Sequence, residues 1–411
     1  MSITLILAPE WDQDILHFLQ REVVEKGHPF VMISVEPGAK CLSLSSSLGS
    51  LSGFQVTYHW QLLDNPVTET LCYIIAADGL TKILKLLQHD LPVAMTIREG
   101  QIYLQSSDYA DLLGDFNLAD DSVEYWLEWV SDKAERNFAQ IPVKDPRVYM
   151  VSASELGRDL KTVAKYIKLT PKGQQQSSSK KSQILQLAFP DETALIQGQA
   201  NGNTVTITLP THQLFRETVH TMVPVVPLVI DTAVKLAGLL VLFAGEVRVE
   251  LTANQLLIKR ESWELSVQVV SACWDCEKIA KTFGQLPESI WCELPATTLS
   301  SVLPKLAVTK TPEKEKLNVE THVASSPHYS DEFRLRVNQD HVGAVVPVKV
   351  AHPFPPSIDI NFNYACFEHI LNALPFSSYW AYLHRIRGLV FCNRSRTIYF
   401  SMACYDGKRN R

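Results

Sequence analysis

The sequence of 411 residues lacks any apolar run long enough to cross a membrane as a helix. Such a helix needs about 20 apolar residues in a row, whereas the longest candidate, residues 229–243, is shorter and contains Asp231 and Lys235. The first residues also lack the positively charged segment and small-residue cleavage site of a secretory signal. We therefore expect a cytoplasmic protein that does not bind membranes.

Cysteine is sparse, with eight residues spread over the chain. A chain of this length can bury a stable core without disulfides, so we expect free thiols in a reducing compartment. Cys273 and Cys276 have a C-x-x-C spacing, but a zinc site needs two further ligands at a compatible spacing and a redox site needs a βαβ context. The sequence shows neither, and we expect no metal and no other cofactor.

Motifs for catalysis are missing as well. There is no P-loop, no G-x-G-x-x-G after a predicted strand and no G-x-S-x-G. Asp120 and Asp121 are adjacent acids, but they open a helical pattern and are better explained as an N-terminal cap region. We expect no catalytic residues and no enzymatic activity. The alternative, an α+β enzyme of another kind, would need a convergent polar pocket that the sequence does not display.

An excess of positive charge is also absent. The 38 Lys and Arg residues are outnumbered by 44 Asp and Glu residues, which gives a net charge of −6. Bulk charge therefore does not attract nucleic acid, and any contact with it must come from a local basic patch.

The sequence does contain a pattern that recurs three times. Helical periodicity begins at Pro9, Ser152 and Leu294, so that neighbouring starts lie 143 and 142 residues apart. A second helical segment follows in each third, at residues 76–87, 229–240 and 362–374. Three alternating segments that predict strands separate the two helices. A predicted hairpin follows each second helix, at residues 93–105, 247–259 and 389–401.

Each third therefore reads as two helices packed on antiparallel strands, which predicts an α+β fold of three repeats. We place the three domains at residues 1–140, 147–276 and 288–411. Residues 120–138 also have helical periodicity, acidic at the start and basic toward the end, as the helix dipole favours. We interpret them as an extra helical connector between the first two repeats.

Three stretches resemble segments of a known family. Residues 357–374 end in Leu371-Asn372-Ala373-Leu374, and residues 226–240 run from a valine-rich strand into a leucine-rich helix. Residues 200–210 form a predicted turn and strand. In this order and spacing they resemble the bacterial β sliding clamp of DNA replication, of which the chain would be a divergent member or paralogue. The resemblance covers nearly the whole chain.

The resemblance implies a ring. In that family two subunits join head to tail, six similar domains encircle duplex DNA, and helices line the hole. It also implies the partners of a processivity factor: double-stranded DNA bound without sequence preference, a second copy of the chain, and peptides of a DNA polymerase subunit and a clamp loader.

A basic stripe gives an independent reason to expect DNA. In the helix that begins at Ser152, basic residues recur at spacings of three and four: Arg158, Lys161, Lys165 and Lys168. Apolar residues recur on a second face: Leu156, Leu160, Val163 and Ile167. A basic face attracts phosphates without reading sequence, although a merely solvated face would show the same pattern. Basic residues of other predicted helices are expected to add to it: Lys82, Lys85, Lys235 and Lys305.

The family also binds short partner peptides in an apolar groove between its second and third domains. The resemblance implies that ten residues line this groove: Ile184, Gly202, Asn203, Val205, Trp274, Ile279, Phe400, Met402, Ala403 and Cys404. The same residues would also suit a plain interdomain core. The chain departs from the family because SMACYDGKRNR lacks the usual proline and Asn203 stands in place of a histidine.

A second function stays open beside the DNA clamp. The clamp fold would also serve as a protein-interaction scaffold in plasmid, phage or defence machinery that does not encircle DNA. The altered C-terminus, residues 120–138 and the uneven charge of the helices favour this alternative.

Overall fold

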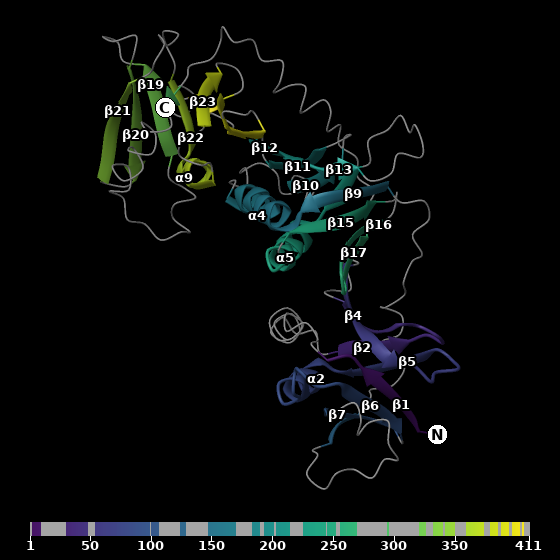
Figure 1. The fold of residues 1–411 in the computed structure, drawn as a ribbon. Coiled ribbons are helices and arrows are strands. Elements are labelled where there is room, and N and C mark those ends of the chain that lie inside the picture. Colours follow the sequence, from purple (N-terminus) through teal and green to yellow (C-terminus); the bar gives the residue numbers. More distant parts are fainter. Residues whose placement is uncertain are drawn as a thin grey trace. The chain divides into compact units, whose positions relative to one another are not determined.

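The computed structural model describes part of the chain, and every structural statement concerns these residues alone: 2–9, 30–47, 54–98, 100–106, 124–128, 147–169, 183–189, 193–200, 203–213, 225–243, 245–251, 255–268, 294–295, 320–325, 332–339, 342–349, 359–373, 379–384, 388–393, 397–402 and 405–406. They form two compact units, whose helices and strands are labelled in Figure 1. Unit 1 comprises Met1–Met150, Leu214–Arg216 and Leu242–Val269, and unit 2 comprises the rest.

Unit 1 is built on one large antiparallel sheet with α2 against it. Its elements are β1 (Ile3–Leu7), β2 (Phe30–Val35), β3 (Cys41–Ser47), β4 (Phe54–Asp64), β5 (Leu71–Ala76), α2 (Ala77–Leu84), β6 (Val93–Arg98), β7 (Gln101–Ser106), β8 (Tyr125–Glu128), β9 (Arg147–Ser152), β15 (Glu246–Leu251), β16 (Gln255–Arg260) and β17 (Trp263–Gln268). The strand order is β9-β15-β16-β17-β4-β1-β6-β7-β8, and β3, β2 and β5 follow on the other edge of β4.

The long strand β4 joins distant parts of the sequence. One edge of β4 pairs with β17 near its start, where Tyr58 lies opposite Trp263, and with β1 near its end, where Leu62 lies opposite Leu7. The rings of Tyr58 and Trp263 also touch, with centroids 5.1 Å apart. The pairing of β17 with β4 therefore fuses the hairpin of residues 247–259 to the N-terminal strands.

Unit 2 contains two antiparallel sheets and three described helices. Its elements are α4 (Ala153–Leu169), β10 (Gln183–Ala188), β11 (Thr193–Ala200), β12 (Asn203–Pro210), β13 (His212–Gln213), β14 (Val225–Leu228), α5 (Ile230–Leu240), β18 (Leu294–Pro295), β19 (Glu320–Ser325), β20 (Glu332–Gln339), β21 (Val342–Lys349), β22 (Asp359–Asn363), α9 (Tyr364–Ala373), β23 (Tyr379–His384), β24 (Gly388–Asn393), β25 (Ile398–Met402) and β26 (Tyr405–Asp406). The sheets run β14-β10-β11-β12-β25-β24-β23-β18 and β21-β20-β19-β22-β26.

Helix α4 packs on β10, β11 and β12 and has α5 and α9 as neighbours. Its contact with β11 is close because Gly198 lacks a side chain. A Cβ added at Gly198 would lie 2.7 Å from Cγ1 of Val163 and would also collide with Ile167. Real Cβ atoms do not approach other atoms this closely, so the glycine sets how near α4 lies to the sheet.

The same order of strand pairing recurs in three parts of the chain. The chains of paired strands β1-β6-β7-β8, β9-β15-β16-β17 and β18-β23-β24-β25 correspond to one another. So do β5-β2-β3-β4, β14-β10-β11-β12 and β22-β19-β20-β21. Helices α2, α5 and α9 occupy equivalent places between the two kinds of chain. The predicted second helices, strands and hairpins of all three thirds therefore form as expected.

The helix predicted over residues 120–138 is wrong where the structure describes it. Residues Tyr125–Glu128 form the strand β8, which pairs antiparallel with β7. Leu127 is buried, and its Cδ2 would lie 2.7 Å from a Cβ at Gly79 of α2, whereas Trp126 is exposed. Pairing with a strand that is distant in sequence overrides the local helical periodicity.

The other early helices cannot be compared in the same way. Residues 10–27 and 296–308 lie outside the described residues, and Leu294–Pro295 form β18 instead of a first helical turn. The predicted helix at residues 152–169 is confirmed by α4. In the described part of the chain no helix is long and apolar enough to span a membrane.

Candidate nucleic-acid interface

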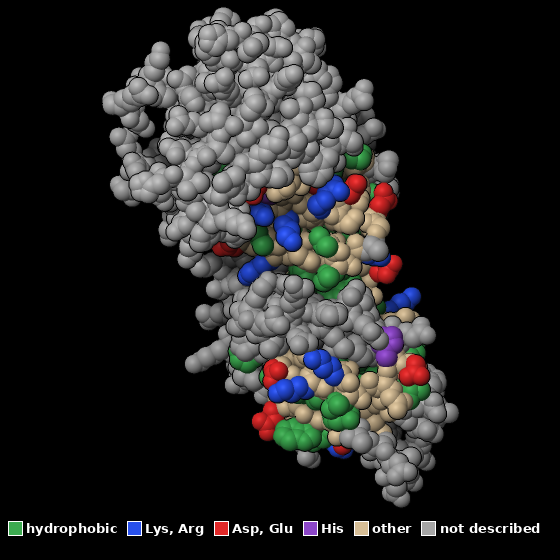
Figure 2. Space-filling model, turned by 90° about the vertical axis from the view of Figure 1, so that its left-hand side faces the viewer, with side chains coloured by type: hydrophobic (Ala, Val, Ile, Leu, Met, Phe, Trp, Pro, Cys, Tyr) green, Lys and Arg blue, Asp and Glu red, His purple; other side chains and the backbone are tan. Residues whose placement is uncertain are grey.

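Helix α4 has the two faces that its sequence predicts. The apolar set, Leu156, Leu160, Val163 and Ile167, is at most 1% exposed. All four basic residues, Arg158, Lys161, Lys165 and Lys168, are exposed. We call these four residues the basic stripe, and at 1.5 Å per residue it extends over about 15 Å of the helix. In Figure 2 a group of blue side chains lies in the middle of the view, on the side of the molecule where Figure 1 shows α4.

The four charges of the basic stripe differ in how they are compensated. Arg158 Nε donates to Asp159 Oδ1 at 2.8 Å, and Lys168 Nζ donates to Asp231 Oδ1 of α5 at 3.0 Å. Lys161 and Lys165, by contrast, form no ion pair with any residue that the structure describes. The centre of the basic stripe therefore offers two uncompensated positive charges, and its two ends are partly neutralised.

Asp159 is the one charged side chain of α4 on the buried side. It is 4% exposed, and burial raises its pKa even though the neighbouring Arg158 guanidinium acts to lower it. Burial in a low dielectric disfavours the charged carboxylate. The hydrogen bonds from Arg158 therefore chiefly offset the cost of burying this carboxylate, and they hold the Arg158 side chain close to the helix.

Helix α5 fixes one flank of α4. A Cβ at Gly157 would lie 3.0 Å from the carbonyl oxygen of Ala237 and from Cβ of Leu240, so the two helices meet closely at this glycine. Asp231, in the first turn of α5, is placed to reach Lys168 across the helix pair. Lys235 of α5 is half-buried and interacts with other residues, so it is not an open charge on this surface.

The remaining predicted DNA-facing residues lie in unit 1 or outside the described residues. Lys82 in the last turn of α2 and Lys85 at its C-cap are exposed, and Lys82 Nζ pairs with Asp78 Oδ2 at 2.6 Å, one turn earlier. Lys305 is not among the described residues. The structure thus brings the basic stripe and Lys235 onto one helix pair and describes Lys82 and Lys85 as part of a separate unit.

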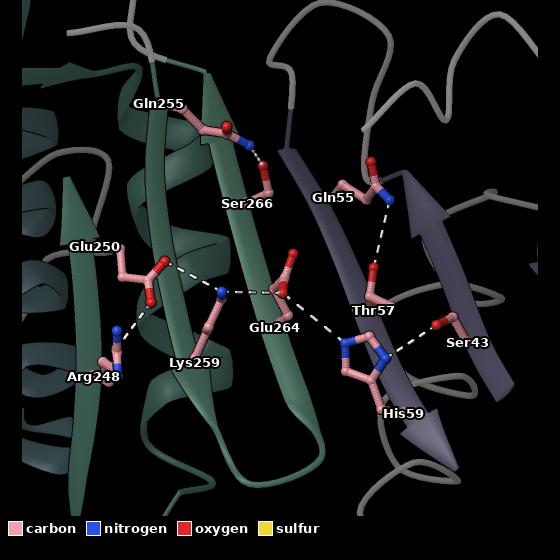
Figure 3. A network of polar contacts seen from close by, with 10 residues as sticks. All are labelled: Ser43, Gln55, Thr57, His59, Arg248, Glu250, Gln255, Lys259, Glu264 and Ser266. Carbon is pink, nitrogen blue, oxygen red and sulfur yellow. Dashed lines mark hydrogen bonds and ion pairs between the residues drawn. The ribbon is translucent and has the colours of Figure 1, made fainter. Parts of the chain in front are cut away.

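A second cluster of charged residues, in unit 1, is compensated throughout (Figure 3). It crosses neighbouring strands of the sheet: Glu250 accepts from Arg248 at 2.9 Å and from Lys259 at 3.2 Å. Glu264 lies 3.9 Å from both Lys259 Nζ and His59 Nε2. Because its positive groups each face a carboxylate, this cluster supports the β4–β17 pairing and offers less open charge than the basic stripe.

Four of the predicted groove residues, Asn203, Val205, Phe400 and Met402, lie in the paired strands β12 and β25. Val205 and Phe400 lie opposite each other across these strands and are fully buried, and Asn203 is 5% exposed. Asn203 Nδ2 lies 3.8 Å from Cys366 Sγ of α9. Ile184 lies in β10 and Met402 in β25. The others lie outside the described residues: Gly202, Trp274, Ile279, Ala403 and Cys404.

Two residues that the sequence did not single out shape this surface. Asp159 lies on the apolar side of α4. The sequence holds a signal for it, because this acidic residue is next to Leu160, which was predicted to lie on the apolar face. His369 of α9 contacts Thr162 of α4, and nothing in the sequence pairs residues that lie 207 positions apart.

Comparison with known proteins places this architecture. No protein-family model matches the sequence. No curated protein matches it either. The fold, however, is that of the sliding clamps, and the resemblance expected from the sequence is confirmed at this level.

Three solved structures illustrate the likeness. The DNA polymerase III subunit beta of Pseudomonas aeruginosa is 14% identical, with 98% of this chain and 100% of that chain covered and a TM-score of 0.70. The DNA polymerase sliding clamp of Caulobacter crescentus is 11% identical, with 98% and 99% covered and a TM-score of 0.67. The Helicobacter pylori beta clamp bound to a DNA ligase peptide is 13% identical, with 98% and 100% covered and a TM-score of 0.63.

Proposed function

We propose that the chain is a DNA sliding clamp, a processivity factor that encircles duplex DNA and has no catalytic activity. The observation that carries this proposal is the basic stripe: α4 of a clamp-like fold presents four exposed cations, two of them without an ion-pair partner among the described residues. Cations in a row attract the phosphate backbone and read no bases. Sequence-independent attraction is what a tether that moves along DNA requires.

The chain would consist of three repeats of one unit, with domains at residues 1–140, 147–276 and 288–411. The threefold recurrence of strand pairing described above supports this division. Two junctions between repeats also follow one rule: the strand that ends the first kind of chain of paired strands in one repeat pairs with the strand that ends the second kind in the preceding repeat. The junctions are β17 with β4 and β25 with β12.

The same rule supplies a third junction and closes the ring. β8 ends the first kind of chain of paired strands in the first repeat, and β21 ends the second kind in the last repeat. Each has one pairing partner among the described strands. An open strand edge is a template for another strand, so β8 of one copy would pair with β21 of a second copy. Trp126, 54% exposed on β8, would become buried in this head-to-tail homodimer.

Partner peptides would bind near the junction of β12 and β25. The Helicobacter pylori clamp was solved with a DNA ligase peptide, and four of the residues expected to line the groove, Asn203, Val205, Phe400 and Met402, lie in these two strands. Because Val205 and Phe400 are buried in the described part of the chain, they would form the floor of the groove, and peptides of a polymerase subunit or clamp loader would contact its rim.

The experiment that tests encirclement compares circular with linear DNA. Protein loaded on a nicked plasmid should stay with it during gel filtration in high salt and should be lost when the plasmid is linearised, because a ring slides off free ends. Equal loss from both forms would refute encirclement, even where the protein binds DNA by charge.

A clamp-fold scaffold that does not encircle DNA is the second candidate. The observation that favours it lies at α5, where Val234 in the helix is 38% exposed and Val241 at its C-cap is 53% exposed. An exposed apolar helix face suits a protein partner better than phosphates. If Lys161, Lys165 and Lys168 can all be changed to Glu without loss of function in cells, the scaffold explains the protein and the DNA clamp does not.

A further inference from the structure

His369 of α9 lies against the middle of the basic stripe. Its Nε2 is 3.0 Å from the carbonyl oxygen of Thr162, which lies between Lys161 and Lys165 on α4. A carbonyl only accepts, so the imidazole carries its proton on Nε2 and donates it. The second lone pair of a helical carbonyl is free for such a bond, because one N–H of the helix occupies the first.

The ring of His369 is held by aromatic neighbours as well. It stacks on Tyr166 of α4 at a centroid distance of 6.3 Å and an interplanar angle of 24°, and Tyr166 meets Phe400 of β25 edge-on at 5.2 Å. His369 is therefore fixed in place by α4 from two directions. Together with the contact of Phe400 on Tyr166, His369 therefore joins α9 and β25 to the helix that carries the basic stripe.

We propose that His369 is a positioning residue for the basic stripe: it anchors α4 beside Lys165, and it takes up a proton when a DNA phosphate binds that lysine. This inference rests on the proposed function, since it requires DNA at the basic stripe. It goes beyond the clamp proposal by assigning a role to a residue that does not itself need to touch DNA.

The charges around His369 favour a neutral ring in the absence of DNA. Burial lowers its pKa, and the positive charge of Lys165 lowers it further, against the opposing effect of the hydrogen bond to Thr162. Among the described groups, α4 brings Lys165 and Tyr166 to the ring, and the uncharged Phe400 of β25 contacts Tyr166. On α9 itself, Glu368 acts on Tyr364, whose pKa is raised to about 12, chiefly by burial.

A phosphate held by Lys165 reverses this balance. It neutralises the lysine and adds negative charge nearby, and a nearby negative charge favours imidazolium. Both ring nitrogens of imidazolium donate, so the hydrogen bond to Thr162 survives protonation and the anchor is kept. The anchored ring therefore gains a proton without releasing α4, and DNA binding becomes tighter as the pH falls.

The size of the effect follows from linkage. If DNA raises the pKa of His369 by about one unit, affinity rises by about threefold at the midpoint of the two pKa values and by at most about tenfold at lower pH. Other histidines add their own pH dependence, so the informative quantity is the difference between the wild type and a variant that cannot titrate at position 369.

The test measures binding of a short duplex of random sequence by fluorescence anisotropy at about pH 7.5 and about pH 6. His369→Gln keeps an N–H donor but does not titrate, and His369→Leu removes both properties. We expect His369→Gln to bind DNA with the affinity of the wild type at the higher pH and about threefold more weakly than the wild type at the lower pH. His369→Leu should bind several-fold more weakly than His369→Gln at both. Melting temperatures of all variants confirm that the comparison is made on folded protein.

Each result has one meaning. Equal pH dependence of the wild type and His369→Gln overturns proton uptake, and equal affinity of His369→Gln and His369→Leu overturns the anchor. The double variant Lys161→Gln/Lys165→Gln separates this inference from the proposed function. If that variant binds DNA like the wild type, the basic stripe is not the interface and both ideas fail. If it binds weakly while the histidine variants behave alike, the inference about His369 alone fails.

Discussion

Removing the two uncompensated charges of the basic stripe should weaken DNA binding far more than removing the two compensated ones. Lys161 and Lys165 have no ion-pair partner among the described residues, whereas Arg158 is bonded to Asp159 and Lys168 to Asp231. A phosphate that recruits Lys168 must first displace an exposed ion pair, which contributes about 0.2–1 kcal/mol. The central lysines have no such contact to lose.

The magnitude follows from counterion release. Each phosphate contact contributes about 0.9 to the slope of log affinity against log salt, which is about eightfold in affinity at 0.1 M salt. Lys161→Gln/Lys165→Gln should therefore lower the slope by about 1.8 and the affinity by about 60-fold for each basic stripe that touches the DNA. Lys168→Gln should lose less. Asp231→Asn, which releases Lys168, should bind more tightly than the wild type.

The assay is duplex binding by fluorescence anisotropy at several salt concentrations between about 50 and 200 mM. Glutamine keeps the length and helix propensity of lysine, so the variants differ mainly in charge, and their melting curves should overlap that of the wild type. Equal losses at Lys161/Lys165 and at Lys168, or no effect of Asp231→Asn, would refute the reasoning that ion pairing at the ends of α4 sets which lysines contact DNA.

Three further predictions concern the packing of α4, the burial of Asp159 and self-association through β8. Gly198→Ala should destabilise unit 2 by about 1–3 kcal/mol because the new methyl group overlaps Val163 and Ile167. Gly238→Ala, in open space on α5, should instead stabilise it by about 0.5–1 kcal/mol. Urea unfolding measures both free energies, and an unchanged stability of Gly198→Ala would show that α4 does not pack closely on β11. Burial raises the pKa of Asp159 above its ordinary value of 3.8, so the folded state binds a proton more readily than the unfolded state. Wild-type stability should therefore gain from this group as the pH falls from neutrality toward that value. Asp159→Asn should remove this gain, and a pH profile of melting temperature equal to that of the wild type would contradict the prediction. Trp126→Lys should weaken self-association more than Trp126→Phe, because charge on an edge strand opposes pairing. Sedimentation of the two variants at falling concentration measures this, and equal self-association would show that β8 is not an interface.

Much of the fold could be predicted from periodicity. The apolar set Leu156, Leu160, Val163 and Ile167 recurs at helical spacing and is buried as expected, because an amphipathic helix must turn that face to a sheet. The second helices and the hairpins were predicted for the same reason, since the signal lies within one helix or within two strands joined by a short turn.

What the sequence could not show depends on contacts between distant residues. The strand β8 forms because Leu127 packs against Gly79 and β8 pairs with β7, whereas the local sequence of residues 120–138 has helical periodicity. The basic stripe was predicted as four equal charges, but Asp231 lies 63 positions from Lys168, so their pairing was invisible. Val205 and Phe400 face each other only because β12 pairs with β25, which no local pattern records.

Two copies of the chain should form a closed ring by pairing β8 with β21. Electron microscopy of the particle, with its mass determined on the same sample, examines this ring directly. We expect twice the 46.2 kDa of one chain and images of a ring of six similar lobes around an open centre wide enough for duplex DNA. A particle with the mass of one chain at micromolar concentration, or a dimer without a central hole, would contradict it.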